Sequence, residues 1–145
     1  MLRKVKIADD AAWLASIGER VAEKRAVKFG CSQTVMALGM ERAGLDDPNL
    51  LRAMEGYCAG GCSGVCGALC GGAAFLGLLM GKGTAEEPRS AELKALVKDL
   101  TCAFRERWGS TLCEELIQGD MTRHDALCPQ FMAWTLRAAW ERLPD

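Results

Sequence analysis

The segment GYCAGGCSGVCGALCGGAAFLGLLMG, residues 56–81, is the most unusual part of this chain. It holds four of the eight cysteines and nine of the sixteen glycines, and it has no charged side chain. The paired glycines at 60 and 61 predict a hinge over residues 59–62. The apolar run that follows predicts a buried helix from about Gly64 to Met80, with Cys66 in its first turn.

The segments on either side have the periodicity of amphipathic helices. The expected helices cover about residues 10–28, 32–43, a short stretch from Pro48, 88–108, a short stretch beginning near Cys113, and 130–142. Thr111 and Glu114 have the spacing of a capping box for the helix that contains Cys113. Pro129 is expected at the first position of the last helix, with Cys128 just before it. No segment shows the alternation of a strand, so we expect an all-α fold, a single-domain bundle of about six helices over residues 1–145.

Charge and composition exclude several functions. The formal net charge is −1 and the basic residues are scattered, which argues against a nucleic-acid partner. The first residues lack the apolar core of a secretory signal, so we expect a cytoplasmic protein. The truly apolar part of the glycine-rich segment, residues 65–80, is short and diluted by glycine, which favours a buried core helix over membrane insertion.

Eight cysteines in a reducing compartment are more often metal ligands, redox groups or core residues than structural cross-links. No C-x-x-C motif is present, so no zinc ribbon, dithiol motif or haem attachment is encoded locally. Four cysteines fall at or next to predicted helix N-termini, where unpaired N–H groups favour a thiolate. They are Cys31, Cys66, Cys113 and Cys128. Four such ends could converge on one anionic centre, such as a four-thiolate metal cluster.

The same four cysteines carry a resemblance to a known family. The chain has a cysteine opening an early helix (Cys31-Ser32-Gln33), then C-G-A-x-x-G at residues 66–71, then G-S-x-x-C-x-x-L at 109–116, and a last cysteine, Cys128. This order resembles the C_GCAxxG_C_C family, whose members are described as redox-active proteins. The family label writes Gly and Cys of the middle motif in the opposite order. Cys70 occupies a variable position of the middle motif, and Cys58, Cys62 and Cys102 have no counterpart in the pattern. The resemblance implies that the family's four cysteines correspond to Cys31, Cys66, Cys113 and Cys128, and it suggests electron transfer.

The first functional interpretation is therefore a small redox protein in which these four cysteines bind an iron–sulfur cluster and exchange electrons with a partner protein. A four-cysteine zinc site fits the same ligands. A second interpretation is metal-free thiol–disulfide exchange, with Cys66 attacking and Cys70, Cys113 or Cys31 resolving. A third is a metal-free interaction protein with inert core cysteines. Cys58, Cys62 and Cys70 are candidates to replace one ligand or to add a second metal site.

Three other features are interpreted as structural. His124 is expected to be a solvated surface residue, although with Asp125 it could orient a thiol. The four tryptophans are expected to pack in the core or at helix ends. The G-x-x-x-G spacing of Gly67 and Gly71 predicts the close approach of another helix or of a second subunit, as in a homodimer.

Overall fold

The fold is described by a computed structural model for residues 10–144. Within that range the chain forms α-helices, two single turns of 3-10 helix and loops, with no β-strand. The α-helices are α1 (Asp10–Ala26), α2 (Cys31–Ala43), α3 (Pro48–Glu55), α4 (Gly67–Met80), α5 (Leu93–Trp108), α6 (Cys113–Leu116) and α7 (His124–Arg142). The 3-10 turns are η1 (Cys58–Gly60) and η2 (Met121–Arg123). The predicted all-α fold is confirmed, with seven α-helices in the described part where about six were expected.

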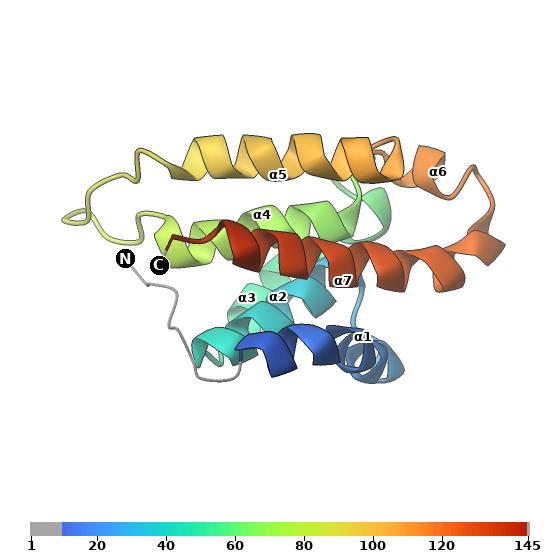
Figure 1. Ribbon diagram of the computed structural model, residues 1–145, viewed down its shortest axis with the longest axis horizontal. Helices are drawn as coiled ribbons and strands as arrows, with labels where there is room; N and C mark the ends of the chain where they lie inside the picture. Colours follow the sequence, from blue (N-terminus) through green and yellow to red (C-terminus); the bar gives the residue numbers. More distant parts are fainter. Residues whose placement is uncertain (1–9, 145) are drawn as a thin grey trace.

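Helix α4 lies at the centre of the bundle and contacts α2, α5 and α7 (Figure 1). Its large side chains Phe75, Leu76 and Leu79 are almost completely buried. Burial on nearly all sides explains why this helix has no charged residue, since an unpaired charge there would be strongly destabilising.

The glycines of α4 allow neighbouring helices to pack at short range. A Cβ atom added at Gly71 would lie 2.9 Å from the carbonyl oxygen of Ser32 and 2.9 Å from Cβ of Val35, both in α2. A Cβ atom at Gly72 would lie 2.5 Å from Cγ2 of Thr135 in α7. The predicted close approach of another helix is therefore confirmed, and the helices are the chain's own α2 and α7. A homodimer stays a prediction.

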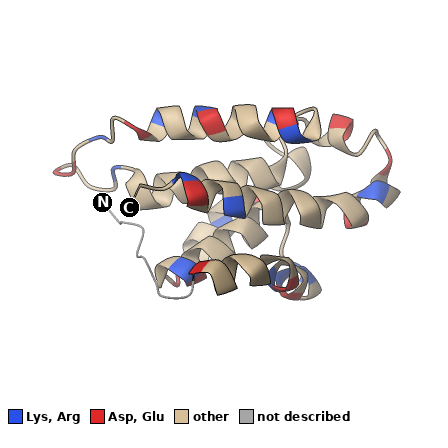
Figure 2. Cartoon of the chain, viewed as in Figure 1, with Lys and Arg blue, Asp and Glu red and all other residues tan. Residues whose placement is uncertain are grey.

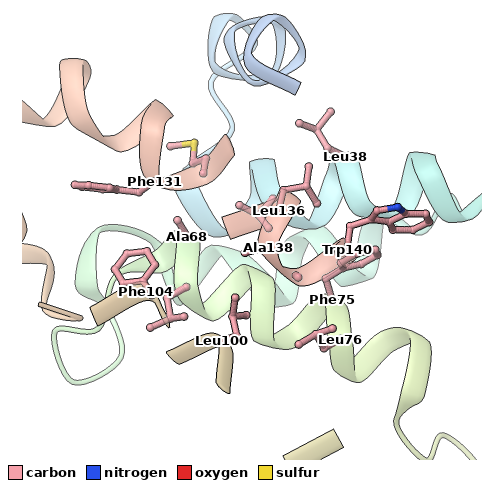
Figure 3. Packing of buried hydrophobic residues seen from close by; sticks show 14 of the residues in the cluster. Leu38, Ala68, Phe75, Leu76, Leu100, Phe104, Phe131, Leu136, Ala138 and Trp140 are labelled. Atoms are coloured by element: carbon pink, nitrogen blue, oxygen red, sulfur yellow. The ribbon is translucent and has the colours of Figure 1, made fainter. Parts of the chain in front are cut away.

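Aromatic side chains fill the space between α4, α5 and α7 (Figure 3). Phe75 of α4 stacks on Trp140 of α7 with ring centroids 6.2 Å apart, and Trp13 of α1 lies 5.3 Å from Trp140. At the other end, Trp108 contacts Phe131 edge-on at 4.9 Å. The prediction that the tryptophans serve packing is confirmed.

Three predicted helix boundaries are wrong. Helix α4 begins at Gly67, so Cys66 is its N-cap instead of a residue of its first turn. Helix α5 begins at Leu93, whereas Pro88 was expected to open it. At the observed start, the Ser90 hydroxyl accepts hydrogen bonds from the amides of Glu92 and Leu93.

The third boundary error concerns the last helix. Helix α7 begins at His124 and continues through Pro129, which was expected to start it. Pro129 is the sixth residue of α7, so its missing N–H removes one hydrogen bond near the helix start. The buried side chains of Cys128, Phe131 and Met132 stabilise the continuous helix on both sides of it.

Charged side chains of both signs are interspersed on the outer helices α1, α5 and α7 (Figure 2). Between residues 10 and 144, no helix has both the length and the apolar character that a bilayer span requires. This agrees with the prediction that the apolar segment is a core helix.

Candidate functional site

The loop before α4 is joined to the loop before α6 by a short antiparallel pairing. The amide of Cys66 donates to the carbonyl oxygen of Thr111 and the amide of Cys113 donates to that of Gly64, each at 2.8 Å. Gly60 has a φ of +73°, and a Cβ atom there would lie 3.2 Å from Cβ of Cys113. The glycine-rich loop therefore turns tightly enough to bring Cys66 and Cys113 side by side.

The structure brings the four predicted cysteines to one cavity at the end of the bundle where α6 and the start of α7 lie (Figure 1). Cys31, Cys66, Cys113 and Cys128 all line it. The other lining residues are Ala59, Gly67, Ala68, Leu116, Ile117, His124 and Phe131. The cavity is apolar and small, about 10 Å³, which is the space of about one water molecule.

Helix N-termini position three of these cysteines as predicted, but not the fourth. Cys31 is the first residue of α2, Cys66 is the N-cap of α4 and Cys113 is the first residue of α6. Cys128 is the fifth residue of α7, because that helix starts before Pro129. The prediction that Cys128 opens a helix is wrong, although its side chain still reaches the cavity.

Burial raises the pKa of three of the cavity thiols. It raises the pKa of Cys66 and of Cys113, and the amides of Leu69 and Ala68 oppose this at Cys66. It also raises the pKa of Cys128 to about 12, with further contributions from the charges of Cys66 and Cys113. A thiolate at Cys66 or Cys113 would therefore disfavour a second thiolate at Cys128.

The sulfur atoms do not form a ready metal site. Among residues 10–144, no group of three or more His, Cys, Asp or Glu side chains has a geometry that could hold a metal ion. A four-thiolate centre would require the sulfur atoms to move closer together and to lose their protons.

His124 is not the solvated residue that we expected. Its side chain is 17% exposed and lines the cavity, with Nδ1 3.8 Å from a carboxylate oxygen of Asp125. The early start of α7 explains this position, since His124 becomes the first residue of a helix that packs on the site.

Three of the other cysteines lie outside the cavity. Cys62 is exposed in the loop before α4, and Cys102 is partly buried in α5. Cys70 lies one turn after Cys66 in α4, and burial raises its pKa to about 11.

Cys58 was predicted only as an extra cysteine that could replace a ligand or add a second metal site, and its place at the start of α2 was not predicted. Gly30, the N-cap of α2, has no side chain, and a Cβ atom there would lie 2.3 Å from Sγ of Cys58. The Cys58 sulfur therefore takes the place of a capping side chain and faces the first amides of α2.

Hydrogen bonds to this sulfur favour the thiolate of Cys58. The Cys31 thiol makes the largest contribution, followed by the Ser32 hydroxyl at 3.0 Å and the amides of Gln33 and Ser32, and they lower the pKa of Cys58 to about 5 against the opposing effect of burial. The same hydrogen bond, together with burial, raises the pKa of Cys31. The alternative in which Cys66 attacks is not favoured, because Cys66 is 5% exposed and its pKa is raised.

We expect the alkylation of Cys58 by iodoacetamide to be nearly independent of pH above about pH 6 and to slow about tenfold per pH unit below about pH 5, because only the thiolate reacts. Ser32→Ala removes the hydroxyl that lies 3.0 Å from the Cys58 sulfur and donates to the carbonyl oxygen of Met54 at 2.6 Å, so the pH at which the rate begins to fall should shift. The rate is measured by mass spectrometry of the Cys58 peptide, with Ser90→Ala as the control. A rate that still rises tenfold per pH unit between about pH 6 and 8 would contradict the assignment.

Comparison with known proteins supports the resemblance in cysteine order. One family model, described as "Putative redox-active protein (C_GCAxxG_C_C)", matches residues 29–141, a range that includes all eight cysteines. No curated protein and no solved structure matches the chain.

Proposed function

Because the chain belongs to the C_GCAxxG_C_C family of redox-active proteins, we propose that it is a small electron-transfer protein that binds an iron–sulfur cluster through Cys31, Cys66, Cys113 and Cys128. One observation carries the proposal: these four cysteines come from the starts of α2, α4 and α6 and from α7, and all of them line one apolar cavity.

The donor set fits such a cluster chemically. Four thiolates are the usual ligands of iron–sulfur clusters, and a bound cluster would supply one-electron chemistry. Zinc accepts the same ligands, but the redox-active family favours iron.

The residues around the cysteines would tune the bound group. The amides of Ala68 and Leu69 face the Cys66 sulfur, and the amide of Ala59 faces the Cys31 sulfur. N–H donors to thiolates stabilise their negative charge and so affect the reduction potential. Leu116, Ile117 and Phe131 limit the access of water to the sulfur atoms.

A reducing compartment suits this function, and we propose that the protein is cytoplasmic. We also propose that its electron partner is another redox protein. In a reducing compartment cysteines are more often metal ligands or redox groups than structural cross-links.

The test is the content of iron, acid-labile sulfide and zinc, with a visible spectrum, in protein purified without oxygen. Iron and sulfide in stoichiometric amounts, with visible absorption that oxidation bleaches, would support the proposal. Stoichiometric zinc without sulfide would identify a four-cysteine zinc protein instead. Colourless protein that binds neither metal, even after reconstitution with iron and sulfide, would overturn the proposal.

A further inference from the structure

We propose that Cys31 and Cys58 form a second redox centre, a dithiol that low-molecular-weight disulfides oxidise to an intramolecular disulfide. This centre is distinct from the four-cysteine cavity, although the two have Cys31 in common. The proposal goes beyond the iron–sulfur function and does not depend on it.

Proximity of the two side chains is the first observation. The sulfur of Cys58 lies beside the start of α2, where a Cβ atom added at Gly30, the residue directly before Cys31, would be 2.3 Å from it. A further contact fixes Cys58, since its Sγ lies 3.0 Å from Oγ of Ser32. The two sulfur atoms are thus neighbours in the folded chain before any oxidation takes place.

Space for the pair is the second observation. A Cβ atom added at Gly67 would lie 2.2 Å from Sγ of Cys31 and 3.4 Å from Cα of Cys58. The Cys31 sulfur and the backbone of Cys58 therefore both border the space that Gly67 leaves open. Side chains this close can be bridged by small rotations, whereas distant cysteines would require the backbone to move.

Exposure determines the order of the reaction. Cys31 is 7% exposed, whereas Cys58 is only partly buried and lies in the loop that leads into α4. An external disulfide therefore reaches Cys58 first, and Cys31 is the resolving cysteine.

The chemistry balances in two exchange steps. The Cys58 sulfur attacks the external disulfide, a bond forms between Cys58 and one of its sulfur atoms, and the other leaves as a thiolate. Cys31 then gives up its proton and attacks the Cys58 sulfur, which forms the Cys31–Cys58 bond and releases the second thiolate. Two electrons pass from the cysteine pair to the external disulfide. The proton of Cys31 goes to one of the two released thiolates, and the other is protonated only from the solvent.

Oxidation of this pair would remove Cys31 from the cavity ligands. A sulfur atom in a disulfide is not a thiolate, so the Cys31–Cys58 bond and a metal bound through Cys31 exclude each other. Metal-free protein is consequently the form in which the disulfide should be sought.

The experiment treats reduced, metal-free full-length protein with oxidised glutathione and maps the peptides without reduction. Tryptic cleavage after Lys28 and Arg42 isolates Cys31 from the other cysteines. We expect the peptide 29–42 to be joined to the peptide 53–82, with a mass lower by two hydrogen atoms. The second peptide holds Cys58, Cys62, Cys66 and Cys70, so fragmentation of the joined peptides must place the bond at Cys58. The number of free thiols should fall from eight to six. A bridge between other cysteines, or no bridge, would overturn the proposal.

Variants assign the roles. Cys58→Ser should prevent the bridge, and Cys31→Ser should accumulate a glutathione adduct on Cys58. Cys62→Ser is the matched control, because Cys62 lies in the same loop, is exposed and should leave the bridge intact. Retention of the bridge in Cys58→Ser would contradict the proposal. Cys113→Ser separates the two proposals, since it should lose the cluster and still form the Cys31–Cys58 bridge.

Discussion

Cys113→Ser is expected to bind iron and sulfide more than about tenfold more weakly than the parent protein. The replacement removes one of four proposed ligands, and loss of an outer-shell partner of a ligand alone costs about 10–100-fold in metal affinity. Cys113 is only partly buried, so its replacement should change the free energy of unfolding by less than about 1 kcal/mol. Iron and sulfide analysis after anaerobic reconstitution measures the first effect, and thermal unfolding of the metal-free protein measures the second.

Cys102→Ser is the matched control for this experiment. Cys102 is also partly buried, but it lies in α5 and does not line the cavity. The Cys102→Ser variant should therefore bind as much iron and sulfide as the parent protein. Equal loss in both variants would indicate a general effect of cysteine removal, and full retention in Cys113→Ser would remove Cys113 from the ligand set.

Gly71→Ala is expected to lower the free energy of unfolding by about 1–3 kcal/mol, the usual cost of an extra methyl group in a close-packed core. The added Cβ would lie 2.9 Å from the carbonyl oxygen of Ser32, a backbone atom that cannot rotate away. Helices α2 and α4 would have to separate by some tenths of an ångström. Denaturant unfolding of the metal-free protein measures the change.

Gly77→Ala tests the same substitution where there is space. Gly77 lies in the same helix, and no atom outside its local backbone lies within 4 Å of an added Cβ. The replacement should raise the free energy of unfolding by up to about 1 kcal/mol, because alanine has the higher helix propensity. Equal effects of the two substitutions would show that the close packing of α2 on α4 does not explain the glycine at position 71.

The helices could be predicted because their signals are local. Helical periodicity and the Asp47-Pro48 start lie within a few residues of the structure they specify, and Asp47 does accept a hydrogen bond from the amide of Asn49. Boundaries failed where a local signal competed with packing. Pro129 is a strong local reason to start a helix, yet the buried residues around it make α7 continuous from His124.

Part of the candidate site could be predicted as well. The positions of Cys31 and Cys66 at helix starts follow from glycine patterns close to each residue. Cys113 does open a helix, but the predicted capping box of Thr111 and Glu114 is wrong, since Leu112 is the N-cap of α6 and no side chain caps it. His124 was misassigned because its inward position depends on where α7 begins, and that is determined by packing beyond the next turn.

Composition, periodicity and cysteine order are properties of the chain alone, and they specify the helical class, the burial of the glycine-rich segment and the membership of the C_GCAxxG_C_C family. Tertiary packing determined which cysteines meet. The pairing of Gly64 with Cys113 and the capping of α2 by Cys58 join residues far apart in the chain; Ser32 and Cys58, for example, are 26 positions apart. No local pattern specifies such contacts, since the geometry of a thiol among amides and other thiols exists only after the helices have packed.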